Sequence, residues 1–148
     1  MMQNDHDPSK QPNRPAKLRP HREGSAAVEF AVVSMLLFTM LFGITDFGTI
    51  YYSLSLLQSG CRDAARQLSV GRLTAANTPA YVKSQVPAWI VNDTSVAVTQ
   101  TAPSDPKTNS FTVTATVPMT SASLTGFFAG MFGTRTIRGF ATMRQEPS

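Results

Sequence analysis

The chain has 148 residues, a formal net charge of +4 and one cysteine, a length that suits one domain with a tail. One cysteine excludes a disulfide within the chain and a cysteine-based metal site. Both histidines, His6 and His21, precede the first apolar segment. If that N-terminal part is removed, no histidine is left for acid–base catalysis, a Ser-His triad or a metal site. Composition therefore argues against an enzyme, and we expect no cofactor.

Residues 1–24 are polar and basic. Five basic residues follow one another here with no acidic residue among them before Glu23; they are Lys10, Arg14, Lys17, Arg19 and Arg22. A basic cluster beside an apolar span keeps its side of the membrane cytoplasmic. A nucleic-acid-binding arm is the competing interpretation of such a stretch. The immediate adjacency to the span favours a role in topology, so we expect a cytoplasmic leader and no nucleic-acid partner.

The segment that follows is apolar as far as Leu57. From Phe30 to Ile44 it carries no charge, and its polar residues are Ser34 and Thr39. A span from about Ala26 to Ser53 is long enough to cross a bilayer. We therefore predict a single transmembrane helix.

Three other interpretations of this segment fit less well. A cleavable signal peptide needs a shorter apolar region followed by a small-x-small site. A lipoprotein signal at Cys61 would need an aliphatic residue where the chain has Gln58. A buried helix of a soluble protein is a poor fit, since residues 30–44 are apolar on every side.

Glu29 is a carboxylate at the start of the span, where a charge is costly. In one interpretation it is interfacial and stabilised by the positive end of the helix dipole. In the other, cleavage after Gly24 makes Ser25 the new N-terminus, one helical turn from Glu29. Packed helices of a filament would then bury Glu29, and the free amine of a neighbouring subunit could pair with it. The leader pattern favours the second interpretation.

Asp46 lies between Gly43 and Gly48. It could sit near the outer headgroups, or contact a partner helix inside the membrane, because the glycines permit close approach of helices. Both interpretations stay open.

The helix is expected to continue past the membrane to about Ser69, with Gly71 as its stop. Asp63 and Arg66 are three residues apart and could pair on one solvated face. Cys61 is interpreted as a small packing residue. A disulfide between neighbouring subunits is the alternative in an oxidising compartment.

The remaining residues predict a small domain with a further helix. Thr78 and Pro79 have the pattern of an N-cap followed by a first helical proline, and this helix should end before Pro87. Trp89 and Ile90 are then expected in the core.

Alternating residues predict an antiparallel sheet. Val96 and Val98 mark one strand, residues 111–117 a second and residues 134–144 a third, the last with Ile137, Ala141 and Met143 inward. Between the last two strands, helical spacing within Ser121–Gly133 predicts a helix that faces the core, with an exposed subunit contact as the alternative; the apolar residues are Leu124, Phe127, Phe128 and Met131.

The predicted fold class is thus α+β. A long N-terminal transmembrane helix is followed by a small domain with a short antiparallel sheet and one or two short helices. The expected division is a basic cytoplasmic leader at 1–24, a transmembrane and extended helix at 25–72, and a small periplasmic domain at 73–148.

Four segments resemble the TadE-like pseudopilins of the tight-adherence (Tad/Flp) type IVc pilus systems. The run Gly24–Phe30, with glycine before the span and glutamate at the fifth position after it, resembles the prepilin processing site. Leu41–Gly48, Cys61–Arg66 and Ile137–Glu146 are similar to later landmarks of the family. Leu73–Asn109 is similar in general character alone.

The resemblance implies that a prepilin peptidase, an intramembrane aspartyl enzyme, cuts between Gly24 and Ser25, and that Glu29 supports processing or assembly. It implies a non-catalytic subunit of the bacterial inner membrane with a cytoplasmic N-terminus and a periplasmic C-terminal domain. Its partners would be other pilins or pseudopilins and the Tad assembly machinery, with display on the pilus or cell surface after assembly. The leader departs from the family in its length and its prolines.

A competing function is an unprocessed bitopic membrane protein that binds a ligand or serves as a scaffold in a secretion system. A hydrolase is a third, but no base, metal cluster or phosphate-binding loop accompanies the many serines and threonines. Incorporation into the filament, a place at its tip and a role as an assembly factor all stay open, as do the ligand of adhesion and the stoichiometry.

Overall fold

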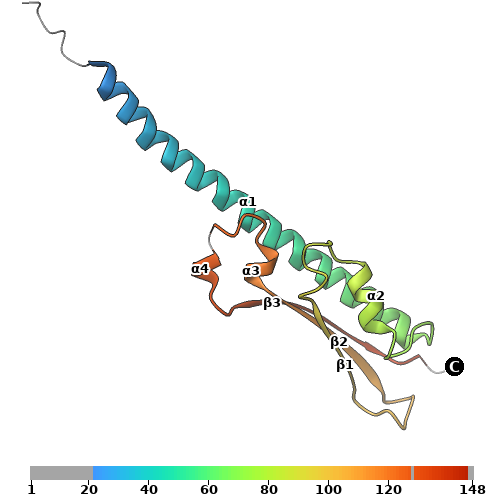
Figure 1. Ribbon diagram of the computed structural model, residues 1–148. Coiled ribbons are helices and arrows are strands. Elements are labelled where there is room, and N and C mark those ends of the chain that lie inside the picture. Colours follow the sequence, from blue (N-terminus) through green and yellow to red (C-terminus); the bar gives the residue numbers. More distant parts are fainter. Residues whose placement is uncertain (1–21, 128, 147–148) are drawn as a thin grey trace, which may run out of the picture. The chain divides into compact units, whose positions relative to one another are not determined.

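A long helix and a three-stranded sheet make up the computed structural model, which describes residues 22–127 and 129–146 (Figure 1). Helix α1 spans Arg22–Ser69, and among the described residues it is the one helix long and apolar enough to cross a membrane. The chain forms two compact units, the first ending at Met35 and the second beginning at Leu36. The predicted α+β fold, a long apolar helix followed by a small antiparallel domain, is confirmed.

The C-terminus of α1 has the expected glycine signal. Gly71 has a φ of +72°, a conformation that other residues adopt at a cost. Its N–H donates to the carbonyl of Leu68, and the N–H of Arg72 donates to the carbonyl of Gln67. These bonds satisfy carbonyls that the end of a helix leaves unpaired. The prediction of a stop at Gly71 is confirmed.

The surroundings of α1 change abruptly at Asp46. None of the residues 24–45 is buried. From Asp46 onward, buried residues recur every three or four positions along one face of the helix; they are Asp46, Ile50, Ser53, Leu57, Gly60, Cys61, Ala64, Ala65, Leu68 and Ser69. This spacing is that of a helix packing one stripe against a domain. The second half of α1 is therefore a core element of the domain.

The sheet has the antiparallel order β1-β2-β3. Strand β1 spans Ser95–Gln100, β2 spans Ser110–Pro118 and β3 spans Thr136–Arg144. Along β2 the alternation is regular, with Phe111, Val113, Ala115 and Val117 buried and the threonines between them half-buried. The prediction of a half-buried strand here is confirmed.

Strand β3 approaches α1 very closely. A Cβ added at Gly139 would lie 2.7 Å from the carbonyl carbon of Leu57 and 2.9 Å from the backbone nitrogen of Gln58. Because these are backbone atoms, no rotamer change can relieve the clash. Ile137 and Ala141, on either side of Gly139, are buried as predicted, whereas Met143 is exposed and that prediction is wrong.

A short helix, α2, spans Thr78–Ser84 and follows the turn after α1. It ends before Pro87 as expected, but its cap is Asn77, and the Thr78 hydroxyl instead donates to the carbonyl of Thr74 at 2.8 Å. Ile90 is fully buried, as predicted. Trp89 is exposed, so its prediction as a core anchor is wrong, and its ring lies 6.5 Å from that of Tyr52.

The segment between β2 and β3 differs most from expectation. Instead of one helix it forms two single turns, α3 at Met119–Ala122 and α4 at Ala129–Phe132. Between them Gly126 has a φ of +67°, which interrupts the helical pattern. The apolar residues expected in the core, Leu124, Phe127 and Met131, are exposed. The prediction of a core-facing helix is wrong, and Phe128 lies outside the described residues.

Candidate functional site

The predicted processing site lies in the first turn of α1. The Gly24–Ser25 bond is exposed, and a Cβ at Gly24 would meet no atom within 4 Å. The Ser25 hydroxyl donates to Oε1 of Glu29 at 3.2 Å, so these two side chains share one face of the helix. N–H groups of a first helical turn have no partner within the helix, and helix ends fray. Residues 1–21 of the predicted leader lie outside the described part of the chain.

Asp46 is fully buried at the point where the domain begins to cover α1. Its Oδ1 accepts two hydrogen bonds from Thr125, one from the backbone N–H at 2.9 Å and one from the hydroxyl at 2.8 Å. The buried carboxyl oxygen is thus hydrogen-bonded, as buried polar groups in folded proteins are. The carboxylate therefore fixes the segment between α3 and α4 to the helix. Contact of Asp46 with a partner helix stays a prediction.

Cys61 is fully buried between α1 and the sheet, in the core cluster that also holds Ala65 and Ala115. A thiol in this position packs as a small apolar side chain. A disulfide with a neighbouring subunit could form only after the domain opened.

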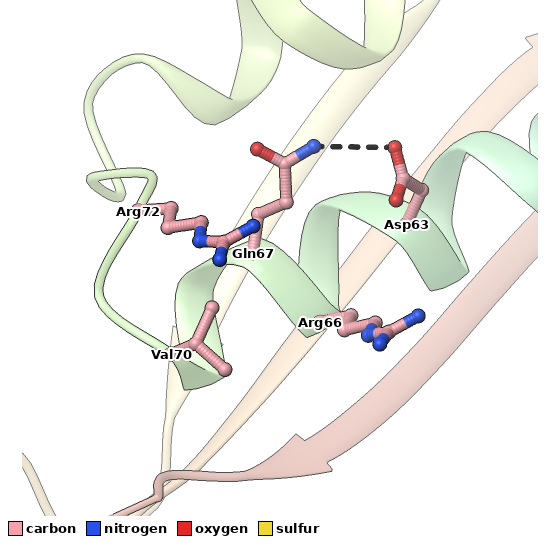
Figure 2. A pocket seen from close by; sticks show the side chains of 5 residues that line it. All are labelled: Asp63, Arg66, Gln67, Val70 and Arg72. Carbon is pink, nitrogen blue, oxygen red and sulfur yellow. Dashed lines mark hydrogen bonds between the residues drawn. The ribbon is translucent and has the colours of Figure 1, made fainter.

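A hollow of about 340 Å³ lies at the C-terminal end of α1 (Figure 2). Figure 2 shows that Asp63, Arg66 and Gln67 come from α1, whereas Val70 and Arg72 come from the turn that follows it. Guanidinium groups suit carboxylate and phosphate groups of a partner. Among its lining residues there is no nucleophile paired with a base.

Next to the hollow, Asp63 links α1 to α2. Its Oδ2 accepts hydrogen bonds from the Tyr81 hydroxyl and, at 3.3 Å, from Nε2 of Gln67. Gln67 also donates to the Tyr81 oxygen at 2.6 Å. The bond to Asp63, together with desolvation and the charge of that carboxylate, raises the pKa of Tyr81 above its ordinary value. The predicted pairing of Asp63 with Arg66 is replaced by this three-residue network.

Sequence reasoning found Glu29, Asp46 and Cys61 but missed the partners that the fold brings to them. Thr125 lies 79 residues from Asp46, and Tyr81 lies 18 residues from Asp63. Neither stands in a motif that could have indicated it. Within the described residues, no group of three or more histidine, cysteine or acidic side chains could hold a metal ion.

A long apolar helix with no buried residue over 24–45, followed by a small sheet domain, is the arrangement of a candidate membrane-anchored protein. The model of the family described as TadE-like protein matches residues 24–66. The predicted resemblance is thus confirmed over α1, and it supports a part in the Tad pilus system and an association with its machinery in general. Searches of curated proteins and of solved structures found no match.

Proposed function

We propose that this chain is a pseudopilin: a subunit cut after Gly24, held by α1 in the bacterial inner membrane, and used in the assembly or structure of a type IVc adhesive pilus. The observation that carries this proposal is the TadE-like match, which begins at Gly24 and covers α1 to Arg66. The basic leader before it supports a cytoplasmic N-terminus. The domain that follows α1 would then be periplasmic.

The geometry of the first helical turn supports processing. The bond to be cut is exposed and lies where backbone N–H groups lack helical partners. Cleavage would convert Ser25 into a positively charged N-terminus, four residues before Glu29 on the same face. In a bundle of packed subunits the carboxylate would need such a counter-charge, because an unpaired buried charge is strongly destabilising. Glu29 would therefore act in assembly by pairing with the amine of a neighbouring subunit.

We further propose that the role is not catalytic. The hollow at the end of α1 presents Arg66 and Arg72 to a partner and lacks a paired nucleophile and base. The partners in the proposed role are the prepilin peptidase, other pilins or pseudopilins, and the Tad assembly machinery.

The test is the N-terminal residue and intact mass of the full chain after extraction from membranes, with active and with inactivated prepilin peptidase. We expect a start at Ser25 that requires the active enzyme. An uncut N-terminus with active peptidase would overturn the proposal and favour an unprocessed bitopic scaffold. A start beyond Leu57 would identify the apolar helix as a signal sequence.

Variants separate processing from assembly. Gly24→Val should leave the chain uncut, whereas the matched Gly48→Val, on an exposed turn of the same helix, should be cut normally. Glu29→Gln keeps the size of the side chain and removes its charge. If it is cut but absent from the pilus fraction, Glu29 acts in assembly; if it is uncut, Glu29 acts in processing.

A further inference from the structure

Three large apolar side chains in the segment between β2 and β3 are exposed. We define the apolar loop patch as Leu124, Phe127 and Met131, all of them exposed. The sequence from Met119 to Thr134 contains no charged residue, and Arg135 follows it. Contiguous exposed apolar side chains on a small domain mark an interaction surface. The domain itself does not cover this one.

The patch continues directly into the apolar surface of α1. The ring of Phe127 stacks on that of Phe42, with 5.2 Å between centroids, and Phe42 in turn stacks on Phe38 at 6.4 Å. Phe42 and Phe38 belong to residues 24–45 of α1, none of which is buried. The patch and the helix therefore present one continuous apolar surface.

The hydrogen bonds of Asp46 fix the level of the patch along the helix. Residues 26–45 have the length of roughly 20 residues that a membrane-spanning helix needs, and Asp46 is the next charged residue after Glu29 at the start of this segment. Thr125 is bonded to Asp46, while Phe127 reaches one turn back toward the span to contact Phe42. The loop thus lies where the helix surface changes from lipid-compatible to protein-covered.

We propose that the apolar loop patch enters the bilayer surface on the domain side and gives the unassembled subunit a second membrane contact beside α1. Aromatic side chains are favoured at this depth, and Arg135 would lie near the headgroups. The inference rests on α1 crossing the membrane, which is part of the proposed function, and does not depend on cleavage after Gly24. Asp46 positions the loop, and the side chains of the patch contact lipid.

Three phenylalanines of nearly equal exposure make a matched test. Phe38 in the span, Phe127 in the patch and Phe140 on β3 are 54%, 52% and 55% exposed. Each is replaced by tryptophan, one at a time, in full-length protein carrying Trp89→Phe. The introduced residue is then the only tryptophan in the chain, and its fluorescence is measured. The protein is placed as single copies in nanodiscs containing dibrominated phosphatidylcholine. Quenching by the bromine atoms reports contact with acyl chains, and quenching by acrylamide reports contact with water.

We expect lipid quenching at position 127 to reach about half or more of that at position 38, with little at position 140. Acrylamide quenching should show the reverse order. Quenching by acrylamide at position 127 as strong as at position 140, without lipid quenching, would overturn the inference in favour of a water-exposed loop. Protection from both quenchers would overturn it in favour of cover by protein.

The same experiment distinguishes this inference from the membrane insertion of α1, on which it rests. Absence of lipid quenching at position 38 would mean that α1 is not in the bilayer, and the membrane anchor itself would fail. Lipid quenching at position 38 without any at position 127 refutes the second contact alone. Met131→Trp in the same background is a second reporter if Phe127→Trp does not fold. If the patch instead binds a second copy of the chain, lipid quenching at position 127 would be absent with one copy per disc. Protection of this position from acrylamide would then appear with two copies per disc.

Discussion

The side-chain amide of Gln58 and the backbone of Phe140 exchange two hydrogen bonds across 82 residues of sequence. Nε2 of Gln58 donates to the Phe140 carbonyl at 2.8 Å, and Oε1 accepts from the Phe140 N–H at 3.3 Å. Because β3 is an edge strand, these backbone groups have no neighbouring strand to pair with. An amide side chain offers a donor and an acceptor together, so Gln58 replaces the missing strand at this position.

Replacing Gln58 by alanine should therefore loosen β3 from α1. The free energy of unfolding of the domain should fall by about 1–2 kcal/mol, since two backbone groups lose their partner. Urea unfolding in detergent, followed by Trp89 fluorescence, measures this. Ser59→Ala is the matched control, because the Ser59 hydroxyl bonds within its own helix to the Ser55 carbonyl. Equal effects of the two variants would contradict the role given to Gln58.

Gly139→Ala should be more damaging than the addition of one methyl group suggests. The new Cβ would lie within 3 Å of the backbone of Leu57 and Gln58, and overpacking of this kind costs about 1–3 kcal/mol. Gly48→Ala is a control of opposite sign, because that helical glycine has open space and alanine favours helix by up to about 1 kcal/mol. Comparison of the two unfolding midpoints checks both. A Gly139→Ala protein as stable as the native chain would rule out the close approach.

Asp46→Ala should release the segment around Thr125. The Thr125 N–H would lose its acceptor, at a cost of about 1–3 kcal/mol. The expected result is faster hydrogen exchange at the Thr125 amide and new proteolytic cleavage between α3 and α4. Asp46→Asn keeps an oxygen acceptor and should retain much of the protection. If exchange is unchanged in Asp46→Ala, the carboxylate does not hold this segment.

The raised pKa of Tyr81 predicts that the stability of the domain changes at alkaline pH. Its pKa is raised chiefly because its hydroxyl donates to Asp63, so the folded state prefers the neutral phenol. The stability gained is fully present below the ordinary pKa of tyrosine and is lost as the pH rises through the raised pKa. Tyr81→Phe should lower the free energy of unfolding by about 1 kcal/mol at neutral pH, since the site is partly exposed. The difference from the native chain should vanish at alkaline pH.

Absorbance titration of tyrosinate identifies the group directly. The native spectrum minus that of Tyr81→Phe isolates Tyr81, and Asp63→Asn should move its titration to lower pH. If Asp63→Asn leaves the titration in place, the hydrogen bond to Asp63 is not the cause of the raised pKa.

Elements fixed by local pattern were predictable from sequence. The length and apolarity of α1, its stop at Gly71 and the alternation along β2 each depend on residues a few positions apart. For the same reason the α+β class and the TadE-like N-terminal segment were within reach of sequence reasoning.

Features that depend on contacts between distant segments were not predictable. Trp89 and Ile90 are adjacent and apolar, yet only Ile90 is buried, because the position of the turn beside α1 decides which one faces inward. The helical spacing around Phe127 predicted a core helix. A left-handed Gly126 and the bonds from Asp46 to Thr125 instead hold the segment as two short turns with its apolar side chains outward. Nothing near Asp46 in sequence indicates that partner.

In the proposed role, the change in burial along α1 at Asp46 determines which contacts the chain would exchange when it leaves the bilayer. The core described for the domain, which includes Ile50 and Leu57 of α1 and extends to Ala141 of β3, is formed within the chain. The environment that must be exchanged is that of residues 24–45 and of the apolar loop patch. In the proposed assembly, transfer from lipid to a bundle of neighbouring helices would change the surroundings of this half of α1 and leave the fold of the domain as it is.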